Sequence, residues 1–291
     1  MDNVLTIDLE EWYHANYDER SFDPDKEYEE RVVGNTEKLL DMFERSGAAA
    51  TFFTLGVIAD KYPELLRSIR SRGHEIATHG YGHGLVYNQT EQEFEEDLQR
   101  SIEAIERAIG CKPIGYRAPS WSVSPRTTWF PSVLLRNGIR YDASVFPVRT
   151  FLYGIPDAPR FPFVLTSDDG ELLEFPTSTY RMLNRNIPFS GGFYLRFLPY
   201  SIIRLFFRKL NSDGRAVICY LHPREIDPGQ PKLESLGRRD AFIHSYGLNG
   251  CEAKLAKLLQ QFRFVTAEKY LFLSNNEFGE RWRLEQSRSG I

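Results

Sequence analysis

Two histidines four residues apart, His79 and His83, are the residues of this chain best placed to do chemistry. The 291-residue sequence holds only six histidines, so a pair at this spacing is informative. Neutral imidazole is the commonest protein ligand for zinc and its first-row neighbours, and an H-x-x-x-H pair on a helical turn places both rings on one side. The spacing therefore predicts that both imidazoles bind one metal ion, with an oxygen ligand nearby.

The oxygen ligand is expected from the acidic run that ends the first predicted strand. Side chains alternate across a strand, so Asp8 and Glu10 share one face while the leucine between them points into packing. Glu10 is therefore the predicted carboxylate ligand. Glu11 faces the other way, although a turn that starts at Glu10 would bring it back to the site. His14, just beyond, is interpreted as a loop-positioning residue rather than a ligand.

Charge and composition argue against several classes of function. The formal charge is −4 with acidic and basic residues interspersed, so no basic stripe indicates nucleic acid and no polybasic segment indicates an anionic membrane. The three cysteines are odd in number and form no C-x-x-C pair, which argues against a disulfide framework. No stretch has the apolar length of a membrane span, and the chain opens directly into a strand-like run without a charged leader. We expect a cytoplasmic protein with a neutral or weakly charged substrate.

Hydrophobic periodicity predicts helices that alternate with strands over the first 120 residues. The longest predicted helix opens with the capping box Thr90-Glu-Gln-Glu93 and ends at Gly110. Such alternation implies parallel βαβ units, and chemistry-bearing residues at successive strand ends are typical of a β/α barrel. We therefore predict an α/β fold, a distorted (β/α) barrel. The predicted segments are helices at 32–47, 63–73 and 90–110, and strands at 48–54, 74–78 and 114–117.

The alternation breaks between residues 146 and 199, where short aromatic and proline-rich pieces replace it. We interpret this stretch as an insertion, after which a helix at 202–210 and a strand at 216–221 resume the pattern. The predicted organisation is a single barrel over residues 1–275 that contains the insertion. A charged C-terminal tail, 276–291, follows it.

Five short motifs follow one another at the predicted strand ends. The motifs are Asp8-Leu-Glu10, His79-x-x-x-His83, Arg117-Ala-Pro119, Tyr141-Asp142-Ala-Ser144 and Leu221-His-Pro223. The ordered set resembles the polysaccharide deacetylase family of carbohydrate esterases, the NodB-homology group, and the resemblance covers residues 4–225 and implies that family's distorted barrel. The run Ile7-Asp-Leu-Glu-Glu-Trp-Tyr-His14, together with Gly191-Gly192, is further similar to the subgroup associated with bacterial exopolysaccharide and exosortase systems.

The resemblance implies a metal-dependent hydrolysis. A divalent ion held by Glu10, His79 and His83 would activate water, and Zn²⁺ is the expected ion, with Co²⁺, Mn²⁺ or Ni²⁺ as alternatives. Asp8 would take the proton of that water. His222 would deliver a proton to the departing amine, which is otherwise too basic to leave at neutral pH.

Two further residues match family positions that orient the catalytic pair. Arg117 would hold Asp8 ionised and in place, and Asp142 would do the same for His222. The alternatives are a surface arginine and a helix-capping aspartate.

Four residues are candidates for contact with the substrate. Trp121 and Leu221 resemble the apolar walls that enclose a small acyl methyl group, with plain core packing as the alternative. Tyr194 and Arg196 lie in the insertion, where an aromatic ring can stack on a sugar and a guanidinium can hydrogen-bond to it. A packing role is the alternative for both.

The chain departs from the commonest family pattern at one position, because adjacent aspartates are replaced here by Asp8 and Leu9. One alternative is therefore that the metal site is lost, as in the metal-independent allantoinase-like relatives. Retention of both histidines favours a metal site with Glu10 as the substitute ligand.

The function predicted from these residues is removal of N-acetyl groups from hexosamine units of a bacterial polysaccharide or its precursor. The alternatives are a deformylase or cyclic amidase that acts on a small molecule, and a catalytically inactive glycan-binding barrel. The expected partner is an N-acetylated carbohydrate, at the inner membrane face if the substrate is lipid-linked. Neither the oligomeric state nor the sugar follows from the sequence.

Overall fold

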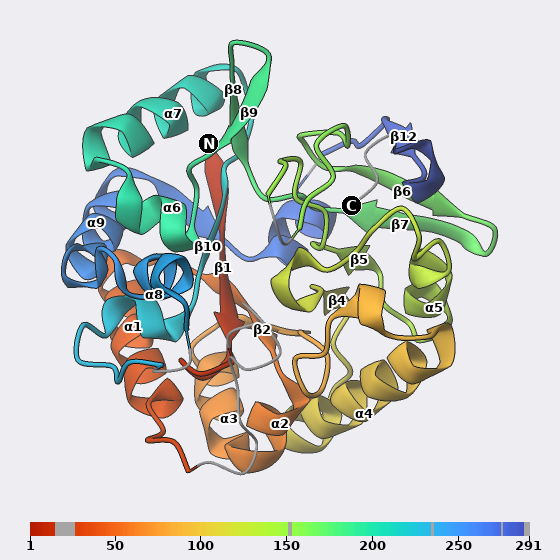
Figure 1. The fold of residues 1–291 in the computed structure, drawn as a ribbon, viewed down its shortest axis with the longest axis horizontal. Coiled ribbons are helices and arrows are strands. Elements are labelled where there is room, and N and C mark those ends of the chain that lie inside the picture. The colour runs from red at the N-terminus through yellow and green to blue at the C-terminus, as the bar shows by residue number, and fades with distance from the viewer. Residues whose placement is uncertain (15–26, 151–152, 234–235, 275, 288–291) are drawn as a thin grey trace.

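The computed structural model describes the 291-residue chain except residues 15–26, 151–152, 234–235, 275 and 288–291. A curved sheet runs through the middle of the molecule, and helices surround it (Figure 1). Its strand order is β10-β1-β2-β3-β4-β5-β7-β6-β12, with β11 also paired to β1. All of these pairs are parallel except β6 with β7.

The elements have the following bounds. The sheet strands are β1 (Asp2–Leu9), β2 (Ala50–Thr54), β3 (Glu75–Thr78), β4 (Gly115–Tyr116), β5 (Tyr141–Asp142), β6 (Phe163–Ser167), β7 (Gly170–Glu174), β10 (Ile218–Leu221), β11 (Arg263–Val265) and β12 (Arg281–Trp282). A separate hairpin consists of β8 (Thr179–Met182) and β9 (Arg185–Pro188). The helices are α1 (Val32–Ser46), α2 (Gly56–Lys61), α3 (Pro63–Ser71), α4 (Glu91–Ile109), α5 (Phe130–Arg136), α6 (Gly192–Phe197), α7 (Tyr200–Ser212), α8 (Arg238–Ser245) and α9 (Leu248–Gln261).

The sheet confirms the predicted α/β class and the distorted barrel. From β1 to β5 each strand lies parallel to the next, and at least one helix connects each pair, which is the βαβ arrangement expected from the sequence. β10 returns to the other side of β1, so the strands that carry the first and the last motif become neighbours. Because parallel strands end at the same edge of a sheet, the residues that follow β1, β3, β4 and β10 meet there.

The helix boundaries confirm the signals in the sequence. Helix α4 begins with the Thr90–Glu93 capping box and ends at Gly110, which has φ 74°. Helix α1 ends at Gly47, which has φ 65°, a backbone conformation that glycine adopts without strain. These ends fix the length of each helix and hence the point at which the next strand, with its motif, begins.

The region between residues 146 and 199 contains β6 to β9 and α6, so it holds regular structure of its own. The last described residues also pack on the sheet, because β12 pairs with β6 and Leu284 is buried. The charged tail predicted from residue 276 therefore includes a strand and a core residue. Within the described part of the chain, none of the helices combines the length and apolar character that a membrane span requires.

Candidate metal and active site

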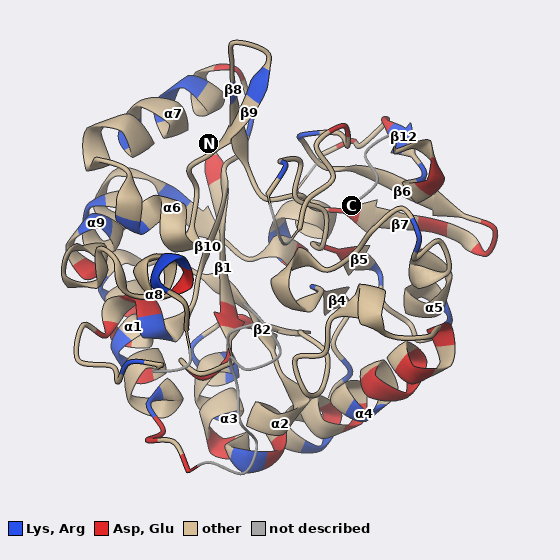
Figure 2. Cartoon of the chain, viewed as in Figure 1, with Lys and Arg blue, Asp and Glu red and all other residues tan. Residues whose placement is uncertain are grey.

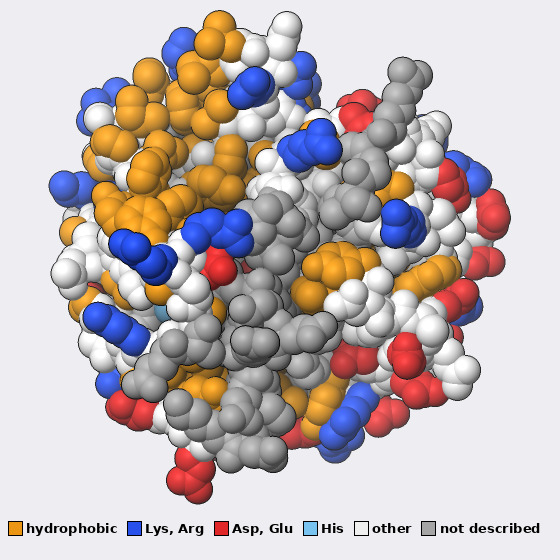
Figure 3. Space-filling model, in the orientation of Figure 1, with side chains coloured by type: hydrophobic (Ala, Val, Ile, Leu, Met, Phe, Trp, Pro, Cys, Tyr) orange, Lys and Arg blue, Asp and Glu red, His pale blue; other side chains and the backbone are white. Residues whose placement is uncertain are grey.

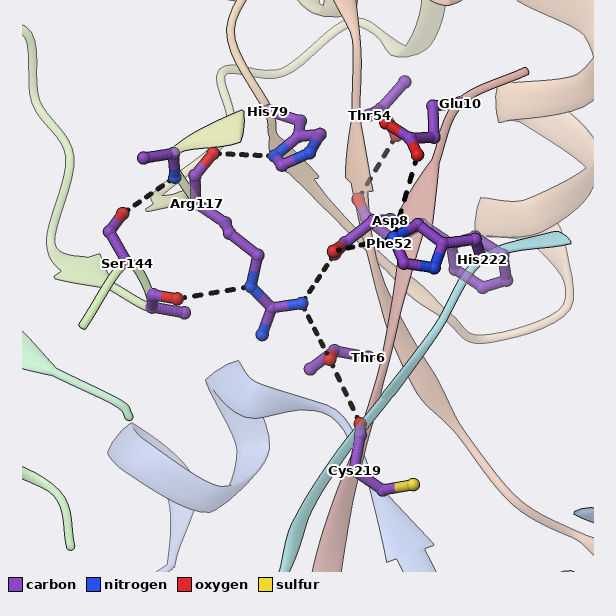
Figure 4. Close-up of polar contacts among 12 residues, drawn as sticks. Thr6, Asp8, Glu10, Phe52, Thr54, His79, Arg117, Ser144, Cys219 and His222 are labelled. Atoms are coloured by element: carbon purple, nitrogen blue, oxygen red, sulfur yellow. Dashed lines mark hydrogen bonds and ion pairs between the residues drawn. The ribbon is translucent and has the colours of Figure 1, made fainter. Parts of the chain in front are cut away.

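A cavity of about 360 Å³ opens at the carboxyl ends of β1, β4 and β10. Asp8, Glu10, His79 and His222 all line it, so the fold brings together residues more than 200 positions apart (Figure 4). Its volume lies within the range of small-molecule sites. Aromatic side chains form much of the rest of the lining, namely Trp121, Tyr153, Phe193, Tyr194 and Tyr220.

The predicted metal ligands form one buried group. One possible ligand atom from each of Glu10, His79 and His83 lies within 4.8 Å of the other two. The Nε2 atom of His83 is 2.7 Å from a carboxylate oxygen of Glu10. Burial would raise the pKa of Glu10, but the neighbouring His83, His222 and His79 lower it below its ordinary range, so the carboxylate is ionised. A buried carboxylate facing two imidazoles is a suitable donor set for a divalent transition metal.

The backbone near His79 selects the nitrogen that faces this group. Its Nδ1 atom is 2.7 Å from the carbonyl oxygen of Arg117, which accepts a hydrogen bond from it. Nε2 is then the unprotonated nitrogen, as in metal sites where a carbonyl orients the imidazole ligand. Burial lowers the pKa of His79 to about 4, which keeps the ring neutral and able to coordinate.

The loop between the two histidines differs from the expected helical turn. Residues 79–85 lie outside any helix, and both Gly80 and His83 have positive φ, 77° and 63°. Helix α4 holds the loop in place, because Asp97 accepts a hydrogen bond from the Tyr81 amide at 2.8 Å and Ser101 donates one to the Gly80 carbonyl at 3.0 Å. The rings thus converge through a tight loop rather than through helical periodicity.

Glu10 and Glu11 have separate tasks, as alternation predicted. Glu10 points into the cavity, whereas Glu11 points to the start of helix α1. One carboxylate oxygen of Glu11 accepts hydrogen bonds from the backbone amides of Arg31 and Val32, at 2.8 and 2.9 Å. Glu11 therefore satisfies amides at the N-terminus of a helix, where a carboxylate is stabilised.

Asp8 is held by Arg117, as the family resemblance implied. The Nη1 atom of Arg117 lies 2.6 Å from Oδ1 of Asp8 and also donates to Thr6 Oγ1 at 2.9 Å (Figure 4). The guanidinium is fully buried and lies 4.1 Å from the centre of the Phe53 ring. A buried ion pair with this geometry fixes the orientation of the Asp8 carboxylate beside the metal group.

His222 lies across the cavity from this pair. Its Nε2 atom is 3.8 Å from Oδ2 of Asp8 and 3.7 Å from Oε1 of Glu10. Its Nδ1 atom lies 3.7 Å from a carboxylate oxygen of Glu225. Burial alone would lower the pKa of His222, but Glu225, Glu10 and Asp8 together raise it above its ordinary value.

Glu225, which the sequence analysis missed, takes the place predicted for Asp142. It follows His222 by three residues in a short 3₁₀ turn and accepts a hydrogen bond from the His222 amide at 3.3 Å. Arg196 holds the other side, with Nε 3.2 Å from Oε1 of Glu225. The available signal was the spacing H-x-x-E in His222-Pro-Arg-Glu225, which on a tight turn brings the two side chains together.

Asp142 has other partners, so its predicted contact with His222 is corrected. It accepts a hydrogen bond from Ser144 at 2.5 Å and forms a buried carboxyl pair with Glu174, its neighbour across β5 and β7. The Ser144 hydroxyl in turn accepts a hydrogen bond from the Ala118 amide at 2.7 Å. Asp142 therefore supports the loop that follows Arg117. It lies away from His222, because β5 ends beside β4 and far along the sheet from β10.

Leu221 differs from its predicted contact with the substrate, whereas Arg196 lines the cavity as predicted but has a guanidinium engaged by protein groups. The guanidinium of Arg196 is buried and engaged by Glu225, by the Ile243 carbonyl at 2.8 Å and by the Tyr246 carbonyl. Leu221 is fully buried in the main hydrophobic core and is outside the cavity lining. Strand alternation explains this, since Tyr220 and His222 face the cavity and the residue between them must face away.

Trp121 and Tyr194 do line the cavity, as predicted. Trp121 packs edge-on against Tyr220 with ring centres 4.6 Å apart and lies 5.3 Å from Tyr153. The backbone at Trp121 has φ 48°, which is uncommon for a bulky residue and holds the indole at this wall. Its Nε1 atom has no hydrogen-bond partner among the described residues, so the indole offers a donor within the buried wall.

Comparison with known proteins assigns the two parts of the chain separately. Residues 21–136 match the family model of polysaccharide deacetylase, and residues 143–272 match a domain of unknown function, DUF3473. A peptidoglycan deacetylase of Helicobacter pylori is 34% identical over 108 residues, 37% of this chain and 36% of that protein. A peptidoglycan-N-acetylglucosamine deacetylase of Bacillus cereus is 33% identical over 84 residues, 29% of this chain and 30% of that protein. The chain thus matches about a third of the length of these relatives.

Solved structures share the fold over most of the chain. A structure of a probable polysaccharide deacetylase from Pseudomonas aeruginosa aligns with a TM-score of 0.56 at 17% identity, over 81% of this chain and 70% of that one. A candidate polysaccharide deacetylase from Mycobacterium smegmatis aligns with a TM-score of 0.52 at 24% identity, over 81% and 75%. The motifs, the buried metal group and these matches agree. Residues 21–136 are thus similar to the polysaccharide deacetylase family, and residues 143–272 are similar to the DUF3473 domain.

Proposed function

We propose that this protein is a metal-dependent de-N-acetylase that removes acetyl groups from hexosamine units of a bacterial polysaccharide or its precursor. One observation carries the proposal. Asp8, a carboxylate fixed by a buried arginine, and His222, a histidine whose Nδ1 lies 3.7 Å from a second carboxylate, face each other beside the group of Glu10, His79 and His83 in a single cavity. Amide hydrolysis needs this set, a base for water and an acid for the amine.

The metal group accounts for the activation of water. A divalent ion bound by Glu10, His79 and His83 would supply a Lewis acid for the amide carbonyl and lower the pKa of a water molecule. Asp8 is placed to accept the proton of the attacking water. Arg117 keeps that carboxylate in a single orientation, because its guanidinium is also held by Thr6 and by the Ala143 carbonyl.

His222 is placed to protonate the departing nitrogen. Its Nε2 atom faces Asp8, so the two groups can act on opposite sides of one amide. Glu225 lies beside Nδ1 and favours the charged imidazolium, and Arg196 holds Glu225 in the turn. Glu225 and Arg196 are therefore positioning residues, since neither needs to touch the substrate.

The wall of the cavity favours a sugar amide. Trp121, Tyr153, Tyr194 and Tyr220 present aromatic faces and hydroxyl groups, which suit a pyranose ring with polar edges. The relatives named above are deacetylases of peptidoglycan, which supports an N-acetylhexosamine substrate. Resemblance of the first motif and of Gly191-Gly192 to the exopolysaccharide subgroup supports an exopolysaccharide as the polymer.

Metal analysis and product release test the proposal together. Protein purified without added metal should hold about one divalent ion per chain, and two histidines with one carboxylate favour Zn²⁺. Acetate should be released from N-acetylated oligosaccharides, and His79→Ala should release none because it loses the ion. Formate release from a small amide would instead indicate the deformylase alternative. A folded, metal-loaded protein that binds the oligosaccharides without releasing acid would indicate an inactive glycan-binding barrel.

A further inference from the structure

The exposed hydrophobic side chains of this protein gather on one face. Ten large hydrophobic residues are exposed among the described residues, and seven of them lie between positions 182 and 246. Figure 3 shows hydrophobic side chains concentrated over α7 and α6, whereas other parts of this view mix charged and polar groups. We call this surface the apolar face, and its exposed members are Met182, Leu183, Phe197, Ile202, Leu205, Phe242 and Tyr246.

Helix α7 has hydrophobic residues on both sides. Ile203, Phe206 and Phe207 point inward and are buried, as in any amphipathic surface helix. Ile202 and Leu205 point outward, with 37% and 44% of their surface exposed. A large part of each of these two side chains is therefore apolar surface in contact with solvent.

An aromatic cluster extends the face toward the cavity. Phe242 and Tyr246 of the α8 region pack with ring centres 4.7 Å apart, and Phe197 lies 5.7 Å from Tyr246. Phe193 stacks on Phe197 at 5.3 Å and also lines the cavity. The apolar face is therefore continuous with the mouth of the proposed active site.

The β8–β9 hairpin carries the most exposed of these residues. Leu183 is 90% exposed and has φ 48°, and Asn184 beside it has φ 60°. Turns with two residues of positive φ favour glycine and asparagine, so a leucine here is costly and gains no packing. Tyr180 in the same hairpin stacks on Phe206 at 4.2 Å, which fixes the hairpin against α7.

Positive charge surrounds the apolar face. Residues 175–215 hold seven lysines or arginines and one acidic residue, Asp213, although the whole chain has a charge of −4. Figure 2 shows basic residues along α7 and on the hairpin, while acidic residues concentrate on α4 at the opposite rim. Arg204, Arg208 and Lys209 on α7 are exposed, so folding assembles a basic surface although the sequence holds no polybasic run.

We propose that the apolar face docks onto the surface of a bilayer that contains anionic lipid. Apolar and aromatic side chains beside Lys and Arg are typical of interfacial helices, which lie in the headgroup region without spanning the membrane. Each basic side chain near an anionic surface adds to the attraction. A second copy of the chain fits less well, because a two-fold contact through α7 would set its cations against themselves. The inference stands independently of the proposed deacetylation.

Docking would set the cavity mouth beside the lipid headgroups. Phe193 and Ile243 line the cavity next to the apolar face, so a bound chain could accept a sugar carried on a lipid anchor. The part of the chain that matches a domain of unknown function, 143–272, includes this entire face. Membrane attachment is the role that we infer for it.

Vesicle sedimentation tests the docking. The full chain should pellet with vesicles of phosphatidylcholine and phosphatidylglycerol, and much less with phosphatidylcholine alone or at high salt. Ile202→Glu with Leu205→Glu should lower the partition coefficient about tenfold or more, because two apolar contacts are replaced by negative charge. Leu273→Glu is the matched control, since Leu273 is 75% exposed outside the face, and it should bind as the native chain does.

A second pair separates the electrostatic part. Arg204→Gln with Arg208→Gln should weaken binding to the mixed vesicles roughly tenfold, and Arg45→Gln with Lys112→Gln, exposed elsewhere, should not. Thermal unfolding by circular dichroism checks that each variant is folded. The proposal is overturned if the native chain stays in the supernatant at low salt, or if the face and control variants bind alike. It is also overturned if the chain is a dimer without vesicles that Ile202→Glu with Leu205→Glu converts to a monomer.

Discussion

The two sides of the cavity are held together in different ways. On the side built from residues 1–136, each functional group is fixed by a neighbouring strand or a backbone atom, such as Arg117 on Asp8 and a carbonyl on His79. On the side built from residues 143–272, His222 is held through a chain of side chains, Glu225 and then Arg196. The first side depends on the parallel sheet, and the second depends on the contact of helices α6 and α8 with a short turn.

The difference has a physical reason. Parallel strands end at one edge of the sheet, so a residue that follows one strand lies near a residue that follows the next. This proximity does not depend on how the surrounding helices pack. β10 is the terminal strand of the sheet order and lies next to β1. The turn that follows it needs partners from elsewhere in the chain. Arg196, in α6, provides one of them from 29 residues away. The side-chain contacts that hold the second side can therefore be altered without altering the strand contacts that hold the first.

The largest expected effect is loss of the metal from the first side. Glu10→Gln should remove the stoichiometric ion, because the carboxylate is the single anionic ligand of the group. Glu11→Gln should keep the ion and lower the free energy of unfolding by about 1 kcal/mol, because Glu11 contacts the start of α1. Elemental analysis and urea unfolding of both variants measure this. If Glu11→Gln lost the ion and Glu10→Gln kept it, the assignment of the two carboxylates would be wrong.

The next effect concerns the base. Asp8→Asn should fold, bind the ion and bind substrate, yet turn over about 10²–10⁴ times more slowly, because an amide cannot accept the proton of water. The measurements are steady-state acetate release and metal content. Near-normal activity with the ion in place would show that Asp8 only orients the site.

A smaller effect is expected on the second side. Glu225→Gln should lower kcat about 10–100-fold with little change in KM or metal content, since it removes the charge that orients and stabilises protonated His222. Asp142→Asn is the control, and its kcat should fall only a few-fold because Asp142 contacts Ser144 and Glu174 instead. If kcat fell more in Asp142→Asn than in Glu225→Gln, Asp142 would be the partner of His222. The two sides of the cavity would then be held in the same way.

What the sequence could predict follows the same division. The barrel follows from the alternation of helices and strands, and the candidate metal ligands Glu10, His79 and His83 follow from short spacings at strand ends. The pairing of Asp8 with Arg117 was implied by the family resemblance. The fold and the proximity of the ligands are confirmed, and the catalytic roles remain predictions. The buried place of Leu221 follows from the alternation of side chains along β10, as the shared face of Asp8 and Glu10 follows from alternation along β1. Glu225 and Arg196 could not be paired from the sequence, because their contact depends on how α6 packs against the turn after β10.

The smallest effect concerns the seam between the two sides, where β5 pairs with β7. Glu174 is fully buried there beside Asp142, and burial followed by the negative charge of Asp142 raises the pKa of Glu174 well above its ordinary value. The folded chain therefore keeps a proton that the unfolded chain releases above about pH 4.5. Its contribution to stability is complete below that pH and declines as pH rises toward the folded-state pKa, by up to about 1.4 kcal/mol per pH unit.

Glu174→Gln should remove this pH dependence, because the amide keeps a donor for Asp142 and an acceptor for the Val145 amide. The stability of the variant relative to the native chain should thus increase between pH 5 and pH 8, measured by urea unfolding at each pH. Glu171→Gln, exposed on the same strand, is the control and should give a constant difference, since Glu171 has a lowered pKa and is ionised in both states over this range. Parallel stability curves for Glu174→Gln and the native chain would mean that Glu174 is ionised when buried. The seam would then hold two charges, and Arg117, rather than a shared proton, would have to balance them.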